Sequence, residues 1–217
     1  MKHFTPHDYQ AQETTLTDAG AVIFSTENVG ELETCGLELA TTTLIGENFP
    51  LQVAAAWVDA TITEYPLAEC YFGQTEAQGC VVNEDGLEVQ DLAGKDLQNS
   101  PDFKFNLAGT YVWPAGDVLP GDVIANASYA WTDGVNHDLQ LAPWMEDDSY
   151  GILNLALGMQ IFGDVNYTVT LFANNVLDES YNSGLLDLSL TAATVATARF
   201  VPRDHERYFG LRVNIGI

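Results

Sequence analysis

The sequence contains few basic residues. Lysine and arginine together number 7, against 31 aspartate and glutamate residues, and the formal net charge is −24 over 217 residues. A nucleic acid would be repelled by so much negative charge, so we expect no nucleic-acid partner. Strong acidity is instead typical of a solvated outer surface, and of one that meets cations.

Long apolar stretches are also missing. No segment approaches the roughly 20 consecutive apolar residues of a membrane helix, and residues 1–8 lack the apolar core of a signal peptide. This excludes helical membrane spans only, because strands of a membrane barrel are about 10 residues long and alternate in polarity. Apolar residues still make up 47 % of the chain, so it can bury a core or face lipid.

Signatures of catalysis and of cofactor binding are absent from the sequence. We find no G-x-S-x-G, no P-loop, no dinucleotide fingerprint and no H-E-x-x-H pattern. We therefore expect no enzyme activity, no catalytic residue, no cofactor and no metal site. A barrel-rim hydrolase is the remaining enzymatic alternative, and its only plausible bases are His137 and His205. The acidic residues of the long connections do not follow the spacing of a calcium loop, which favours simple solvation.

The dominant positive signal is alternation of apolar and polar residues with a period of two, which is the mark of β-strands with two different faces. At the C-terminus, Phe209, Leu211, Val213, Ile215 and Ile217 share one face, and Tyr208, Gly210, Arg212, Asn214 and Gly216 share the other. The same pattern predicts about eight strands, at residues 7–16, 28–44, 51–64, 103–113, 122–132, 150–161, 166–175 and 206–217.

The connections between these strands alternate between long and short. Residues 65–102, 133–149 and 176–205 form long connections, whereas residues 45–50, 114–121 and 163–165 form short ones. Bacterial outer-membrane barrels have short periplasmic turns and longer extracellular loops. We therefore predict an all-β fold: an antiparallel up-and-down transmembrane β-barrel wall, either closed into a small barrel or left as an open curled sheet. Aromatic residues near the strand ends indicate girdles at the membrane interfaces, and residues 185–198 fit a short helix or a strand extension equally well.

Four local patterns carry a resemblance to a known family. They are Asn174-Asn175-Val176-Leu177-Asp178-Glu179-Ser180-Tyr181, then Pro202-Arg203 before the last strand, then Asn28-Val29-Gly30 with Gly36-Leu37-Glu38, and finally residues 91–101, which read D-L-A-G-K-D-L-Q-N-S-P. Along the chain they occur in the expected order, from residue 28 to residue 217, and together they resemble segments of the C-terminal barrel of TonB-dependent outer-membrane receptors. The first is similar to that family's N-N-[LVI]-[FL]-D-x-x-Y segment.

The resemblance implies a function and a set of partners. It implies a single β-barrel domain over residues 1–217, the C-terminal portion of a larger barrel, in the outer membrane of a Gram-negative bacterium. Such receptors take up scarce nutrients, for example ferric siderophores, and contact outer-membrane lipid and an inner-membrane energising complex. The plug domain, the energising motif and a signal peptide are missing, so we expect a fragment. Structural motif roles are implied for Asn174, Asn175, Asp178, Tyr181, Pro202 and Arg203, whereas the ligand-binding residues stay unassigned.

Two further expectations concern the fold alternative and the cysteines. A self-contained eight-stranded outer-membrane or lipocalin-like barrel that binds a ligand is the alternative to a receptor fragment. Cys70 and Cys80 lie in the longest connection, where export to an oxidising compartment would allow a disulfide. Cys35 is expected to be a small wall residue, and in a full barrel Glu38, Lys104, Arg212 and Asn214 would point to the lumen.

Overall fold

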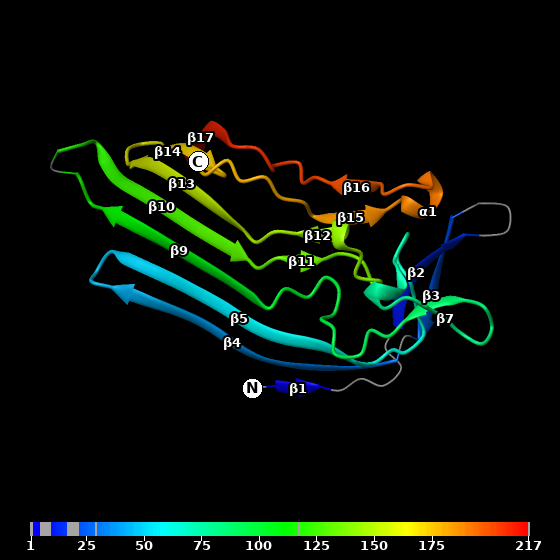
Figure 1. Cartoon of the computed structure of the whole chain (residues 1–217). Coiled ribbons are helices and arrows are strands. Elements are labelled where there is room, and N and C mark those ends of the chain that lie inside the picture. Colours follow the sequence, from blue (N-terminus) through cyan, green and yellow to red (C-terminus); the bar gives the residue numbers. More distant parts are fainter. Residues whose placement is uncertain (1, 5–9, 17–21, 29, 117, 217) are drawn as a thin grey trace.

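The computed structural model describes residues 2–4, 10–16, 22–28, 30–116 and 118–216. Its main feature is an antiparallel sheet of eight strands, here called the wall, in the order β1-β4-β5-β9-β10-β13-β14-β17 (Figure 1). The bounds of these strands are β1 (Lys2–Phe4), β4 (Glu31–Ile45), β5 (Phe49–Glu64), β9 (Phe103–Trp113), β10 (Gly121–Thr132), β13 (Tyr150–Ile161), β14 (Asn166–Asn174) and β17 (Tyr208–Gly216).

Shorter elements lie outside the wall. The strands are β2 (Gln10–Leu16), β3 (Val22–Asn28), β6 (Ala68–Glu69), β7 (Val81–Val82), β8 (Glu88–Gln90), β11 (Val135–Asn136), β12 (Glu146–Asp147), β15 (Gly184–Asp187) and β16 (Thr197–Phe200). The helical turns are η1 (Glu76–Gln78), η2 (Pro143–Met145) and α1 (Ser189–Ala192). Across the described ranges, no helix is long and apolar enough to cross a membrane.

From residue 31 onward the wall confirms the predicted strands. The alternating segments appear as β4, β5, β9, β10, β13, β14 and β17, each within a few residues of its expected bounds. Residues 185–198 contain both of the structures that the sequence left open, because α1 lies between the paired strands β15 and β16.

The prediction that residues 7–16 form the first strand of the wall was wrong. The described part of that segment is β2, which pairs with β3 in a separate two-stranded sheet, and the first wall strand is β1. Residues 7–9 lie outside the described residues. The pairing of β2 with β3 continues the register of β1 with β4. Lys2 lies opposite Gly36, and Gln10, eight residues later, lies opposite Asn28, eight residues earlier than Gly36. The segment between the predicted strands at 7–16 and 28–44 contains most of β3, a strand that the alternation pattern did not predict.

The wall has two chemically different faces. From Leu32 onward, residues directly opposite each other across the strands are odd-numbered on one face and even-numbered on the other. Between β4 and β17 the odd face carries no charged residue over positions 37–45, 49–57, 103–113, 123–131, 151–161, 167–173 and 209–215. The even face carries the predicted lumen residues, Glu38, Lys104, Arg212 and Asn214, among amides and hydroxyls.

Aromatic side chains form two bands on the odd face. Near the long loops, Phe103, Phe105 and Trp131 have ring centroids about 6 Å apart, and Trp57 lies directly opposite Phe103. Near the short turns, Phe49 packs 6.5 Å from Tyr111. Within β5, Phe49 and Trp57 are eight residues apart, or about 26 Å along the strand. This matches the height of the apolar band of a transmembrane barrel, about 25 Å.

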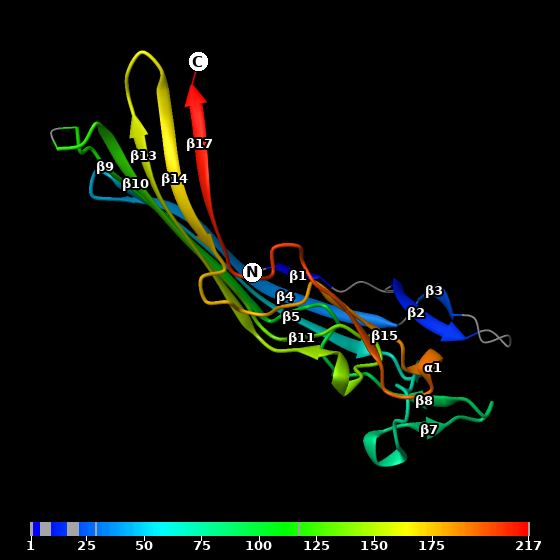
Figure 2. The same cartoon turned by 90° about the horizontal axis from the view of Figure 1, so that it is seen from above.

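The wall is curled but open. β1 and β17 are the two edges of the sheet and are not paired with each other in the described part of the chain, as the view from above shows (Figure 2). Of the two fold alternatives, the open curled sheet is therefore correct and a self-closed small barrel is not.

Turns and loops are sorted to opposite ends of the wall. The short turns β4–β5, β9–β10 and β13–β14 lie at one end with the C-terminus, and the three long connections lie at the other (Figures 1 and 2). The buried apolar side chains gather at the loop end, around Ile62, Ala68 and Leu92. Side chains on the odd face stay exposed instead, up to 72 % for Phe209. The fold therefore buries its core in the loops and leaves its apolar wall for another environment.

Candidate functional site

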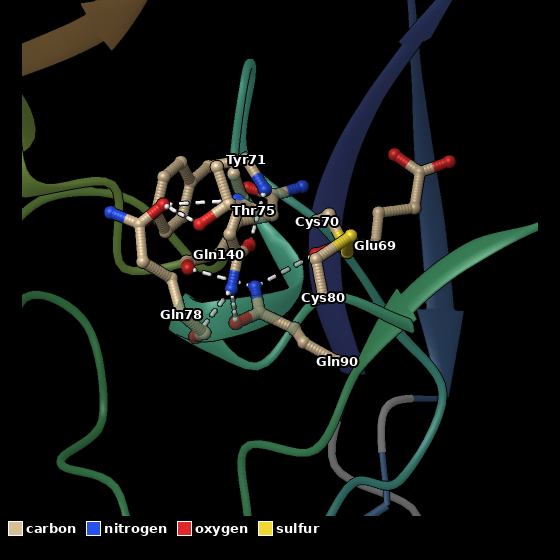
Figure 3. Close-up of a disulfide and its surroundings, with 9 residues drawn as sticks. Glu69, Cys70, Tyr71, Thr75, Gln78, Cys80, Gln90 and Gln140 are labelled. Carbon is tan, nitrogen blue, oxygen red and sulfur yellow. Dashed lines mark hydrogen bonds between the residues drawn. A yellow bond between two sulfur atoms is a disulfide. The ribbon is translucent and has the colours of Figure 1, made fainter. Parts of the chain in front are cut away.

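The three long connections form the candidate site, and we call them the loop layer: residues 65–102, 133–149 and 175–207. In the first loop, β6, β8 and β7 form a small antiparallel sheet. Cys70 and Cys80, the candidate disulfide pair, are bonded with an S–S distance of 2.04 Å and a Cα–Cα distance of 5.8 Å (Figure 3). The free cysteine, Cys35, lies in β4 of the wall.

Glutamine side chains hold the disulfide segment in place (Figure 3). Gln90 donates from Nε2 to the carbonyl oxygens of Glu69 (2.9 Å) and Gln140 (3.0 Å). Its Oε1 accepts from Nε2 of Gln74 at 3.0 Å. Gln90 is buried, so these bonds satisfy polar atoms that water does not reach. The contact with Gln140 joins the first loop to the second.

The D-L-A-G-K-D-L-Q-N-S-P segment returns the first loop to the wall. Its backbone pairs with the end of β5, where Leu92 N donates to Tyr65 O (3.0 Å) and Leu97 N donates to Ala60 O (2.8 Å). The side chain of Leu92 is 1 % exposed in the core of the loop layer. Asn99 then turns the chain with φ of 56°. This segment of the family resemblance therefore fixes where the first loop meets the barrel.

His137 connects the first two loops. Its Nδ1 lies 2.7 Å from Oδ1 of Asn99, and its Nε2 lies 3.1 Å from Oδ2 of Asp147. Asp147 in turn accepts a hydrogen bond from Nδ2 of Asn182 in the third loop, at 2.7 Å. Both ring nitrogens of this candidate base are therefore engaged with structural partners. His205, the other candidate base, lies 2.9 Å from the carbonyl oxygen of Pro202 through its Nδ1.

Asn175 organises the start of the third loop. It is 1 % exposed and has a left-handed φ of 47°. Its Nδ2 donates to the carbonyl oxygens of Glu179 (2.8 Å) and His205 (2.7 Å), and its Oδ1 accepts from the amide of Glu179 (3.0 Å). Its own backbone amide donates to Oδ1 of Asn154 at 3.0 Å. One asparagine thus joins both ends of the third loop to β13.

The other motif residues surround this turn. Asp178, with φ of 58°, accepts from Arg207 at 3.2 and 3.3 Å, and Asn174 contacts the hydroxyl of Tyr208. Tyr181 stacks on Tyr150 with ring centroids 4.9 Å apart, and burial raises its pKa, with smaller contributions from Tyr150 and Asp204. Arg203 is exposed. The six residues singled out by the resemblance thus lie in the third loop or at its junction with β14.

Gly30 shows why the third sequence pattern needs glycine. Its φ is 81°, and a Cβ at this position would lie 1.7 Å from the carbonyl oxygen of Glu64. No other residue could occupy it without moving the backbone of β5. The glycine therefore allows β4 and the end of β5 to approach closely just below the loop layer.

A cavity of about 290 Å³ lies between the three loops, and we call it the inter-loop cavity. Its lining includes Glu69 from the first loop, Asp138 from the second and Asp187 from the third. Asp187 accepts a hydrogen bond from Nε1 of Trp144 (3.2 Å), and Trp144 meets Tyr71 edge to face with ring centroids 5.5 Å apart. The cavity walls are therefore held together by contacts across all three loops.

Asp138 carries an unusual carboxyl group. Burial raises its pKa to about 6; backbone hydrogen bonds, including one from Ala142 N at 3.2 Å, oppose this shift, and the charge of Asp187 adds to it. A second cavity of about 360 Å³ beside it is lined by Asp96, Asp102 and other acidic residues. Burial, then the charges of Asp96, Asp133 and Asp59, raise the pKa of Asp102. Burial, with a smaller effect of neighbouring carboxylates, thus favours the protonated form of both Asp138 and Asp102.

Sequence reasoning did not find this cavity. Glu69, Asp138 and Asp187 are far apart in the sequence and belong to no motif, so only the folded loops bring them together. Within the described residues, no group of three or more histidine, cysteine, aspartate or glutamate side chains has the arrangement of a metal centre. The lining of the inter-loop cavity presents carboxylate groups and other hydrogen-bonding groups.

The comparisons with known proteins agree with this architecture. The family model described as "TonB dependent receptor-like, beta-barrel" matches residues 7–176. No curated protein matches the sequence. Solved structures share the fold, and the three described next are between 13 % and 17 % identical to this chain.

The first is the ferric yersiniabactin uptake receptor FyuA from Yersinia pestis, with 13 % identity and a TM-score of 0.62 over 87 % of this chain and 24 % of that one. The second is the siderophore receptor PiuA from Acinetobacter baumannii, with 17 % identity and a TM-score of 0.57 over 95 % and 24 %. The third is the ferric preacinetobactin receptor BauA, also from Acinetobacter baumannii, with 14 % identity and a TM-score of 0.57 over 94 % of this chain and 25 % of that one. This chain spans about a quarter of the length of these receptors. With most of the sequence matched, the chain belongs to the TonB-dependent receptor-like β-barrel family.

Proposed function

We propose that this chain forms part of the wall and outer loops of an outer-membrane receptor that takes up a ferric siderophore. The observation that carries the proposal is the odd face of the wall, which is uncharged over seven strands and bounded by two aromatic bands. An exposed apolar surface of this extent is unstable in water but suits the hydrocarbon region of a bilayer. The three neighbouring structures are named as receptors for siderophores or their ferric complexes, which supports the choice of ligand.

The wall suits lipid only as part of a closed sheet. Backbone groups have no water to bond with inside a bilayer, so the free edges at β1 and β17 must be paired by further strands of a complete barrel. In this arrangement the odd face meets outer-membrane lipid and the even face lines the lumen. The loop layer then lies outside the cell, and the short turns lie in the periplasm, on the side of an inner-membrane energising complex.

We further propose that the chain has no catalytic activity. The two candidate bases serve the loop layer, His137 through Asn99 and Asp147, and His205 through Pro202. None of these partners is a nucleophile that an adjacent histidine activates in acyl transfer. A binding and transport role uses the same contacts to hold the loops in one arrangement.

The orientation can be tested in intact cells with the complete receptor that contains this segment. An epitope inserted after Glu84, at the exposed end of the first loop, is expected to bind antibody on whole cells. The same epitope inserted after Asp164, in the β13–β14 turn, is expected to bind only after the outer membrane is opened. Surface binding at Asp164 with none at Glu84 would contradict the proposed orientation.

The ligand can be tested by iron uptake. A strain that lacks the receptor is compared with the complemented strain, using radioactive iron supplied as a ferric hydroxamate or as a ferric catecholate. We expect the complemented strain to accumulate at least one of these complexes and to lose uptake when the membrane is de-energised. Equal uptake by both strains for both complexes would reject siderophore transport and leave a receptor for another nutrient.

A further inference from the structure

The even face of the wall contains a polar cleft of about 250 Å³, which we call the even-face cleft. Small residues leave the space for it, because the side chains of Ala108 and Ala156 end at Cβ. The polar side chains of its lining come from β9, β10, β13 and β14, and they are Thr110, Asn126, Ser128, Asn154 and Asn174. No charged residue of the described chain lines the cleft. A charged group would find no counter-charge here, so the cleft suits an uncharged group that forms hydrogen bonds.

Asn154 offers a hydrogen-bond donor to this cleft. Its Oδ1 accepts from the backbone amide of Asn175 at 3.0 Å. A backbone amide can only donate, so this contact fixes the orientation of the side chain and turns its Nδ2 toward Ser128, whose Oγ lies 3.4 Å away. That distance is longer than a typical hydrogen bond, so the bond is weak and Nδ2 keeps most of its capacity to donate.

Asn126 offers a second donor. Its Oδ1 accepts from the hydroxyl of Thr110 at 2.8 Å, and its Nδ2 has no hydrogen-bond partner in the described part of the chain. Asn126 lies opposite Ala156, two residues from Asn154 on the same face of the neighbouring strand. The cleft therefore presents two amide donors with free capacity, and these fit a hydrogen-bond acceptor such as a carbonyl oxygen.

Two side chains of the cleft also hold the ends of the third loop. Asn154 binds the amide of Asn175, whose own side chain joins both ends of that loop. Asn174 contacts the hydroxyl of Tyr208, which is the first residue of β17 after the loop. The side chain of Asn154 thus lines the cleft and supports the loop at the same time. A change at either place reaches the other through this one side chain.

We propose that the even-face cleft binds an uncharged carbonyl oxygen of the ligand through the amide donors of Asn126 and Asn154, and that Asn154 couples this binding to the third loop. The inference rests on the proposed function and adds a ligand class: a neutral ferric chelate that carries amide carbonyl groups. An acceptor at Nδ2 of Asn154 polarises its amide and strengthens the bond from Asn175, which steadies the loop. By reciprocity, a steadier loop favours binding in the cleft. A backbone carbonyl of the complete receptor's own chain has the same chemistry, and the test distinguishes the two sources.

The binding test uses the complete receptor in detergent and ferrichrome, a neutral ferric hydroxamate built on a cyclic peptide, with quenching of tryptophan fluorescence as the readout. Asn126→Asp keeps an oxygen that can accept from Thr110 but loses the amide donor. Asn106→Asp makes the same change at an exposed asparagine of the even face that lies outside the cleft. We expect Asn126→Asp to weaken binding by about tenfold, through loss of a hydrogen bond and repulsion of the carbonyl oxygen, and Asn106→Asp by less than about twofold.

The coupling is tested by hydrogen exchange of the Glu179 amide, which donates to Oδ1 of Asn175 and so reports on the third loop. In the wild type we expect saturating ferrichrome to slow this exchange by at least about threefold. Asn154→Asp keeps an oxygen for the amide of Asn175 but removes the donor to the cleft. Its exchange without ligand should stay close to that of the wild type, and ferrichrome should no longer slow it. A purely structural role of Asn154 would leave the ligand effect in place.

The outcomes separate this inference from the proposed function. Equal weakening by Asn126→Asp and Asn106→Asp, or binding that leaves the exchange of Glu179 unchanged, would overturn the inference and leave siderophore uptake in place. Faster exchange of Glu179 in ligand-free Asn126→Asp would assign the cleft to a carbonyl of the receptor's own chain and overturn the ligand assignment. A receptor that takes up a ferric catecholate but does not bind ferrichrome would also overturn the inference alone. If neither class of chelate is taken up, the proposed function fails and the inference fails with it.

Discussion

Asn175 offers the most direct test of how the third loop is held on the wall. Its side chain makes three hydrogen bonds, two from Nδ2 to carbonyl oxygens and one to Oδ1 from the amide of Glu179. A hydrogen bond of this kind contributes about 1 kcal/mol, and more when a buried partner is left unsatisfied. Asn175→Gly removes all three bonds but keeps a residue that tolerates φ of 47°. We expect it to destabilise the loop by about 3 kcal/mol.

Asn175→Ala adds a second effect to the same loss. An alanine must also adopt the left-handed conformation, which costs a further 1–2 kcal/mol, roughly. The predicted order of loop stability is therefore wild type, then Asn175→Gly, then Asn175→Ala. Asn175→Asp separates donor from acceptor, because a carboxylate can still accept from the amide of Glu179 but faces the carbonyl oxygens of Glu179 and His205. We expect it to be no better than Asn175→Gly.

The assay is hydrogen exchange of the third loop in the detergent-solubilised protein. Exchange of the Glu179 amide reports directly on the bond to Asn175, and trypsin cleavage after the exposed Arg203 reports on opening of the loop. A 3 kcal/mol loss predicts about a hundredfold faster exchange where exchange follows opening. Equal exchange in the glycine and alanine variants would refute the backbone part of the reasoning. A change below about fivefold in the glycine variant would refute the hydrogen-bond part.

Three further predictions test the wall, the junction and the cavity. Leu155→Arg, midway along the apolar face of β13, should lower the free energy of unfolding of the membrane-embedded protein by about 2–4 kcal/mol. Ala156→Arg, on the opposite face, should lower it far less. Urea unfolding in vesicles measures both variants, and equal losses would contradict the assignment of faces. Gly30→Ala should abolish or severely lower the yield of folded protein. Gly46→Ala, at a similar positive φ but with nothing within 4 Å, should cost only about 1 kcal/mol in the same unfolding assay. Asp138 has a folded-state pKa near 6, above its ordinary 3.8, so its stabilising contribution is present below about pH 4 and is lost as the pH rises through 6. Asp138→Asn should therefore slow hydrogen exchange of residues 133–149 relative to wild type at pH 7.5, by up to about 3 kcal/mol in opening free energy, with little difference at pH 4.

The wall could be predicted from the sequence because its signal, the alternation of apolar and polar residues, lies within each strand. A barrel strand has one face in lipid and one in the lumen, so every second residue is apolar over the whole strand, as in β13 and β17. The lengths of the connections then predicted that short turns lie at one end of the wall and long loops at the other. The N-terminal hairpin escaped this reasoning because β1 and β2 are short, and their alternation is too weak to show which sheet each one joins.

The sequence singled out Asn175 and Asp178 only as part of a family segment, and it did not predict their contacts. In the structure both residues adopt the left-handed backbone that asparagine and aspartate tolerate best, at the turn after β14. By contrast, β7 and β12 are two residues long, and contacts such as Trp144 with Asp187 join positions 43 residues apart. No local pattern encodes such a contact, so the inter-loop cavity became visible only in the folded chain.

The distribution of buried residues suggests how wall and loops divide their tasks. The loop layer shares a small core with the end of β5, where Ile62, Ala68 and Leu92 are nearly inaccessible, and it is braced by a disulfide and by hydrogen bonds between loops. The odd face of the wall instead keeps large apolar side chains exposed, as Leu157, Leu171 and Phe209 show, and under the proposed function it would be covered by lipid. Rigid loops lose little conformational entropy when a ligand binds, so more of the contact free energy remains as affinity. The disulfide and the hydrogen bonds between loops would in this way favour the ligand binding that we propose for the complete receptor.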